Sequence, residues 1–304
     1  MVVSFRRTDN IPKLSARKRF DRYLKESEHH IRDPEIDDQN LQKIILAWKN
    51  FHFDVRASAD QSYYRVVEEL VTPRTPSSRE IEKFVVELAA YQEDADFPAK
   101  AGFFLSVLIN RSDETDFIIQ TVHLDEPIAH LGSSNLKNIT ILGDVGDYTG
   151  AYMKTGMINI KGNCESNLGY GMSGGLIVLD GNAEDSVGNF MSGGKITVGQ
   201  STGSGLGYVM TGGELVITGN VYGGVGDEMS GGSITIAGNV ISIRRDARLR
   251  RLTVDRAIRD SVFIGHLMTG GCINLEGNYP LSLMVDSING GEIYHKGKLI
   301  RKSE

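Results

Sequence analysis

Aliphatic residues occupy every second position in a series of short runs through the second half of the chain. Alternation with a period of two predicts a strand that buries one face. These strands end on a glycine, and an asparagine follows in most of them. The aliphatic pairs are Ile158 and Ile160, Ile177 and Leu179, Ile196 and Val198, Leu215 and Ile217, and Ile234 and Ile236.

A methionine precedes each of these strands, and a glycine lies three residues before each methionine. The first five methionines are 19 residues apart, and a fixed period of this length is typical of a solenoid with one coil per repeat. A 19-residue unit with one short strand is too small for a helical hairpin and fits one turn of a β-helix. The glycine–methionine pairs are Gly150 and Met153, Gly169 and Met172, Gly188 and Met191, Gly207 and Met210, Gly226 and Met229, and Gly265 and Met268.

The fold class that follows is an all-β, right-handed, single-stranded parallel β-helix over residues 128–304. We expect the aliphatic pairs to stack inward about 4.8 Å apart, and the methionines to fill the core because their side chains adapt to irregular gaps. A methionine-lined metal or cofactor channel is the alternative, but a column that recurs at every coil favours packing. The glycines provide left-handed turns, and the asparagines are expected to stack as a ladder.

The number of coils follows from the period. An incomplete repeat begins near Ser134, and a second incomplete repeat ends near Lys298. Counting the repeats between these ends gives about nine coils. The distance from Met229 to Met268 is 39 residues, or two periods plus one, so we expect one further coil, with its strand at Leu252–Val254.

Arginines are concentrated between residues 241 and 263. One interpretation is a solvated loop or short helix on a degenerate coil. The other is a docking element or anion site, because insertions in solenoids tend to line the binding face. The candidate docking residues are Arg244, Arg245, Arg248, Arg250 and Arg251.

Residues 1–127 differ in composition and predict a smaller α+β domain of unknown role. Of the 35 glycines, only Gly102 lies before residue 128. Helical spacing of apolar residues predicts helices over residues 15–28 and from about Asp37. A third helix follows the capping box of Ser77 and Glu80.

Two alternating runs close this N-terminal region. Phe103–Ile109 and Asp116–Leu124 flank a polar turn, which predicts a β-hairpin. A hairpin in this place is suited to cap the first coil, whose open end would otherwise expose unpaired backbone groups.

The charge, the length of the apolar runs and the number of cysteines exclude several classes of function. The net charge is −6, and no basic tail or large basic surface points to nucleic acid. The apolar runs are too short to span a membrane, and no signal-peptide pattern precedes them. Cys164 and Cys272 are the only cysteines, which excludes a cysteine-held cluster within the chain and fits a cytoplasmic protein. We find no residue pattern for catalysis, cofactor binding or metal binding.

The run from Gly169 to Asn182 and its copies resemble the Gly-rich β-helix domain of two protein families. One is the C-terminal domain of the large chain of glutamate synthase, and the other is the Gly-rich β-helix subunit of formylmethanofuran dehydrogenase. The resemblance covers roughly residues 134–298 and implies a scaffold that carries no catalytic residues. Glutamate synthase uses an N-terminal cysteine nucleophile, whereas this sequence begins Met1–Val2, so we do not expect that activity here.

Three functions compete at this point. The first is a non-catalytic scaffold that docks to partner subunits of such a complex or to a second copy of itself. The second is an enzyme or small-molecule binder with its site where the N-terminal domain meets the rod. The third is an anion- or nucleic-acid-binding module that uses the arginine cluster. Residues to inspect for the second are Tyr63, Tyr64, Arg65, His123 and His130.

Overall fold

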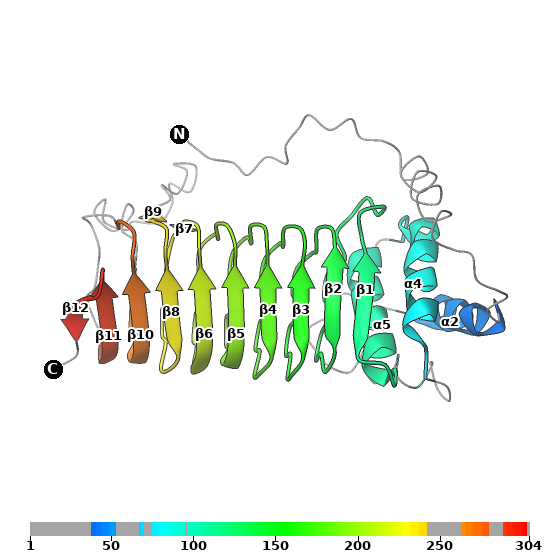
Figure 1. Cartoon of the computed structure of the whole chain (residues 1–304), viewed down its shortest axis with the longest axis horizontal. Coiled ribbons are helices and arrows are strands. Elements are labelled where there is room, and N and C mark those ends of the chain that lie inside the picture. The colour runs from blue at the N-terminus through cyan, green and yellow to red at the C-terminus, as the bar shows by residue number, and fades with distance from the viewer. Residues whose placement is uncertain are drawn as a thin grey trace, which may run out of the picture.

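The chain forms a rod of stacked coils with helices packed at one end (Figure 1). The computed structural model describes residues 38–52, 67, 69, 75–94, 96–241, 263–279 and 288–302. The predicted helix over residues 15–28 lies outside these described residues.

One 10-stranded sheet runs along the rod in the order β1-β2-β3-β4-β5-β6-β8-β10-β11-β12. Every neighbouring pair is parallel except β11 with β12, so the predicted parallel solenoid is confirmed. Its strands are β1 Asp116–Gln120, β2 Asn138–Leu142, β3 Met157–Ile160, β4 Leu176–Leu179, β5 Ser192–Val198, β6 Gly212–Ile217, β8 Ser233–Ile236, β10 Thr269–Leu275, β11 Gly290–His295 and β12 Lys298–Lys302.

A second side of the coil stacks through single bridges and one two-stranded sheet. The sheet pairs β7 Val221–Tyr222 with β9 Val240–Ile241. Parallel bridges continue this stack toward the N-terminus through buried positions, and they place Cys164 between Val145 and Ala183.

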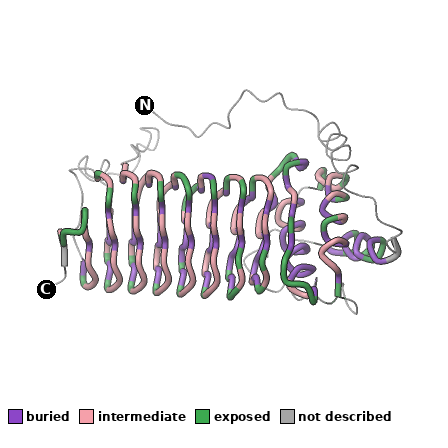
Figure 2. The backbone as a smooth tube through the Cα atoms, viewed as in Figure 1, coloured by how far each residue is buried: buried purple, intermediate pink, exposed green. Residues whose placement is uncertain are grey.

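The interior is a set of in-register columns, visible in Figure 2 as buried segments that recur from coil to coil. Ile158 pairs with Ile177, and Ile177 pairs with Ile196, as the period predicts. The predicted packing role of the methionine column is confirmed, because all six side chains have no exposed surface: Met153, Met172, Met191, Met210, Met229 and Met268.

The glycine before each strand is required by the neighbouring coil. Gly156 has φ +79°, and a Cβ at this position would lie 2.1 Å from the carbonyl oxygen of Lys137. The glycines three residues before each methionine also have positive φ, from 66° to 69°. The glycines before the strands and the glycines before the methionines therefore allow each coil to turn without displacing the adjacent coil.

The asparagines form the expected ladder, mainly through their side-chain oxygens. Each oxygen accepts a hydrogen bond from the backbone N–H of the equivalent residue one coil further on. The bonds run from Asn182 to Asn163 at 3.0 Å, from Ser201 to Asn182 at 3.1 Å, from Asn239 to Asn220 at 2.8 Å and from Asn278 to Asn239 at 2.9 Å.

The prediction of a further coil between Met229 and Met268 is wrong. β8 pairs directly with β10, with Ile234 opposite Ile273, so no rung lies between them. The backbone N–H of Thr269 also donates to the carbonyl oxygen of Met229. The extra residues are an insertion within one coil, and Leu252–Val254 lies outside the described residues.

The N-terminal helices are α2 Asp38–Asn50, α4 Ser78–Glu87, the 3-10 helix η2 Leu88–Tyr91 and α5 Phe97–Arg111. The predicted capping box is confirmed, since Ser77 and Glu80 bond to each other's backbone N–H groups. Trp48 packs edge-on against Phe104, with ring centroids 5.5 Å apart, and these helices share one hydrophobic cluster with the coils.

The predicted hairpin is wrong in its first half. Residues 103–109 belong to the buried helix α5, because a continuous apolar run fits a buried helix as well as a strand. β1 confirms the second run as a strand, but it pairs in parallel with β2 and forms the first rung of the sheet. The sheet therefore begins at Asp116, before the boundary predicted at residue 128.

Helix α5 performs the capping role that the hairpin was expected to have. The Ser106 hydroxyl oxygen accepts from the backbone N–H groups of Gly132 at 2.9 Å and Ser133 at 3.2 Å. One helical turn later, Asn110 donates to the carbonyl oxygen of Ser134 at 3.3 Å and accepts from the N–H of Leu136 at 3.0 Å. These side chains supply hydrogen bonds that an adjacent coil supplies elsewhere.

Candidate interaction surfaces

Each coil has two outward surfaces, which we call the strand side and the turn side. The strand side comprises residues 154–161, 173–180, 192–199 and 211–218, and it carries the sheet. The turn side comprises residues 143–152, 162–171, 181–190, 200–209 and 219–228, and it connects one strand to the next methionine.

Charges on the strand side are paired between neighbouring coils. Lys161 Nζ lies 3.0 Å from Asp180 Oδ2, and Lys195 Nζ lies 2.9 Å from Glu214 Oε1. All four side chains are partly exposed, so each pair contributes at most about 1 kcal/mol. The strand side thus presents a sheet face whose opposite charges largely neutralise each other.

The turn side carries a continuous row of aromatic rings, which we call the aromatic ridge. Its members are Tyr148, Tyr152, Tyr170, Phe190 and Tyr208. Neighbouring ring centroids are 5.1 to 5.7 Å apart, within the range of favourable edge and tilted contacts. Phe190 is 43% exposed and Tyr152 is 37% exposed, so the ridge presents apolar surface to solvent.

Three ridge residues hold an uncommon backbone conformation, and one of them is Tyr148 with φ 58°. Tyr152 has φ 56° and Phe190 has φ 59°, and the equivalent residues Val209, Glu228 and Leu267 have φ from 53° to 57°. Left-handed backbone costs a residue with a Cβ about 1–2 kcal/mol. Bulky side chains therefore occupy a position where glycine would be the less strained choice.

The charged residues of the turn side are all acidic. Its five segments contain no lysine or arginine, whereas their acidic residues are Asp144, Asp147, Glu165, Glu184, Asp185, Asp227 and Glu228. Several of these carboxylates surround the Cys164 thiol, whose pKa is raised well above its usual value by burial and then by this negative charge. Cys164 is therefore held as a thiol within the packed column.

Carboxylates approach the ridge at both of its ends. Asp147 precedes Tyr148, and burial, the neighbouring Tyr170 and this carboxylate together raise the pKa of the Tyr148 hydroxyl. At the other end, the Tyr208 hydroxyl donates to Glu228 Oε1 at 3.3 Å. The ridge is thus an aromatic surface set among negative charges.

Asp227 and His266 are neighbours on successive coils. Burial raises the pKa of Asp227 to about 6, against the opposing effect of His266. Asp227 Oδ1 and His266 Nδ1 are both buried and have no hydrogen-bond partner among the described residues. This carboxyl group therefore takes up a proton at higher pH than an exposed aspartate.

The two histidines predicted near the junction contact different elements. His123 Nε2 lies 3.1 Å from the carbonyl oxygen of Val85 in α4. The His130 ring is stacked between Phe103 of α5 at 4.3 Å and Tyr148 at 5.0 Å, and burial lowers its pKa to about 4. The structure thus places His130 as the link between the helices and the aromatic ridge.

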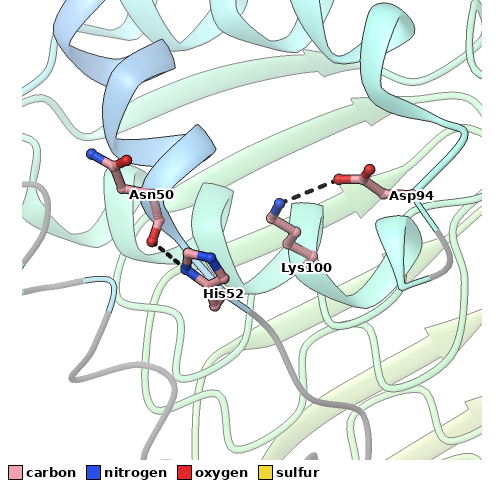
Figure 3. A network of polar contacts seen from close by, with 4 residues as sticks. All are labelled: Asn50, His52, Asp94 and Lys100. Atoms are coloured by element: carbon pink, nitrogen blue, oxygen red, sulfur yellow. Dashed lines mark hydrogen bonds and ion pairs between the residues drawn. The ribbon is translucent and has the colours of Figure 1, made fainter.

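Polar side chains of the helical region form local contacts (Figure 3). Lys100 Nζ lies 3.3 Å from Asp94 Oδ2 and 4.3 Å from the centre of the Trp48 ring. His52 Nδ1 lies 2.9 Å from the carbonyl oxygen of Asn50, as a separate contact. These groups pair within the helices and do not converge on the predicted junction histidines.

Other predicted residues lie outside the part of the chain that the structure describes. They are Tyr63, Tyr64 and Arg65 of the predicted junction site, and the candidate docking residues Arg244, Arg245, Arg248, Arg250 and Arg251. Within the described ranges, no three His, Cys, Asp or Glu side chains form a group able to hold a metal ion. The same ranges contain no helix that is long and apolar enough to cross a membrane.

The fold and these surfaces define the chain as a parallel β-solenoid with a helical cap. No protein-family model matches the chain, and no curated protein matches its sequence.

Proposed function

We propose that the chain is a non-catalytic scaffold, a β-helix subunit or paralogue that docks to partner subunits of a cytoplasmic complex similar to glutamate synthase or formylmethanofuran dehydrogenase. The observation that carries the proposal is the in-register stacking of the coils. Because each coil repeats the same internal columns, its outward residues are free to vary, and the rod offers a long rigid flank to other proteins. The resemblance of the Gly-x-x-Met-x-x-Gly repeat supports the choice of complex.

Isolation from native cells tests this function. The tagged whole chain, expressed at its native level, is purified and its partners are identified by mass spectrometry. We expect subunits of a dehydrogenase or an amidotransferase-type synthase in fixed stoichiometry with the chain. Recovery of the chain alone, together with turnover of a metabolite by the pure chain, would overturn the proposal in favour of an enzyme.

A further inference from the structure

We propose that the aromatic ridge binds an extended, arginine- or lysine-rich segment of a partner protein. The inference rests on the proposed docking function and names the surface and the chemistry of the partner. It is carried by two properties of the turn side that the strand side lacks: exposed rings in contact with one another, and acidic charge with no basic residue among it.

The rings and the carboxylates favour the same kind of ligand. Guanidinium and ammonium groups bind over aromatic faces through the negative electrostatic potential above the ring. They also form charge-assisted hydrogen bonds with carboxylates. Glu184 and Asp185 are exposed, and they lie one coil from Glu165. The coil of Glu165 also carries Tyr170, and the coil of Glu184 carries Phe190, so a basic chain laid along the rod has a ring and a carboxylate available on each of these coils.

The strained backbone supports a binding role. Phe190 and Tyr152 bring large side chains to solvent at left-handed positions. Gly171 occupies the equivalent position one coil from each, and a Cβ there would lie 2.8 Å from the Tyr152 ring. The glycine therefore leaves space for the ring of its neighbour, which keeps the ridge continuous.

The arginine-rich insertion of the chain itself is the alternative occupant of the ridge. The insertion joins the turn side between Ile241 and Phe263, whereas most of the carboxylates lie three to five coils away. At about 4.8 Å per coil this separation is roughly 14–24 Å. The insertion is anchored at both ends, and about ten residues in each direction reach on the order of 35 Å. Its length therefore permits contact, and replacement of its arginines in the test below decides between the two occupants.

Binding of a fluorescein-labelled deca-arginine peptide to the whole chain, followed by fluorescence anisotropy, tests the proposal. The turn-side variant combines Glu165→Gln, Glu184→Gln and Asp185→Asn. The strand-side control combines Asp180→Asn, Glu214→Gln and Glu276→Gln, which removes the same charge. We expect the dissociation constant to rise at least about tenfold in the turn-side variant and less than about twofold in the control.

A second pair of variants tests the rings. Tyr152→Asn with Phe190→Asn removes two rings and keeps a residue type that accepts left-handed backbone. Tyr294→Ser removes a ring from the strand side as the control. We expect the ridge variant to weaken binding at least about fivefold, with no change in the control. Circular dichroism confirms that each variant is folded.

Four results would overturn the proposal. They are absence of peptide binding at low salt, equal weakening by the two charge variants, unchanged binding after loss of the ridge rings, and much tighter binding once Arg244, Arg245, Arg248, Arg250 and Arg251 are changed to Gln. The last result would show that the insertion occupies the ridge. If the native complex is still recovered in any of these cases, only the assignment of the ridge fails, and the docking function stands.

Discussion

Each coil passes through left-handed backbone at several positions, and two of these positions, four residues apart, hold different kinds of residue. The position before the strand is glycine in every regular coil, as at Gly156 and Gly175. The position on the turn side holds Tyr152, Phe190 or Val209 with similar φ. The backbone of the neighbouring coil occupies the Cβ site at the first position, whereas the second faces outward.

This difference separates residues that build the rod from residues that are free for binding. Where the neighbouring coil is closest, the repeat tolerates no variation. Where the coil faces solvent, strain is accepted and side chains of very different chemistry appear. Backbone outliers that the interior does not require are candidates for function.

The largest expected effect comes from Gly156→Ala. The new Cβ adds left-handed strain and overlaps the carbonyl oxygen of Lys137, so we expect a loss of about 4 kcal/mol in the free energy of unfolding. Urea denaturation measures this loss. An unchanged unfolding midpoint would show that the two coils are not in close backbone contact.

Met191→Ala tests the packed interior. The side chain is fully buried, so its removal leaves a cavity and costs about 3 kcal/mol. Met157 is 40% exposed on the strand side, and Met157→Ala is the matched control, with an expected change below about 0.5 kcal/mol. Equal losses for the two variants would contradict the placement of the methionine column in the core.

The His130 stack predicts a dependence of stability on pH. Because the folded-state pKa is lowered to about 4, the unfolded chain binds a proton that the folded chain rejects between about pH 6.5 and pH 4. Stability therefore falls as the pH falls through this window, by at most about 3 kcal/mol. His130→Phe keeps an aromatic ring and should make stability less dependent on pH within this window.

Asp227 affects the pH dependence of stability in the direction opposite to His130. Its raised pKa means that the folded chain binds the proton first as the pH falls from about 6 toward the ordinary range of an aspartate, so stability rises there. Urea titrations of the wild type, His130→Phe and Asp227→Asn separate the two effects. A slope that is the same in wild type and His130→Phe would contradict the buried stack.

The smallest expected change in stability comes from Val209→Gly, which tests the left-handed position on the turn side. Val209→Gly relieves left-handed strain at a partly exposed residue, so we expect stability to change by no more than about 1 kcal/mol, in the stabilising direction. Differential scanning calorimetry measures the midpoint. A clear destabilisation would show that Val209 packs against its neighbours and does more than fill an outward position.

The regular coils were predictable residue by residue because every repeat places the same position in the same environment. The pairing of Ile158 with Ile177 and the burial of Met172 follow directly from the period. The number of coils predicted from the 19-residue period was wrong after Ile234. The 39 residues from Ile234 to Ile273 have the length of two repeats but form one coil with an insertion.

The structure at the ends of the rod and on its outer surface was harder to predict from the sequence. The run Phe103–Ile109 is apolar except for Ser106, and one polar residue does not distinguish a buried helix from a buried strand. The aromatic ridge was missed because its rings occupy three positions of the repeat, those of Tyr148, Tyr152 and Tyr170, and so form no single column. The stacking of His130 depends on α5, which the hairpin prediction excluded.

The most direct test of the account is the quantity of partner that co-purifies from native cells with three forms of the chain. These are the wild type, the turn-side variant and the strand-side control with equal charge loss. The proposed role of the turn side predicts that the partner is retained by the wild type and the control and is lost from the turn-side variant. Retention of a stoichiometric partner by the turn-side variant, with loss from the strand-side control, would contradict it.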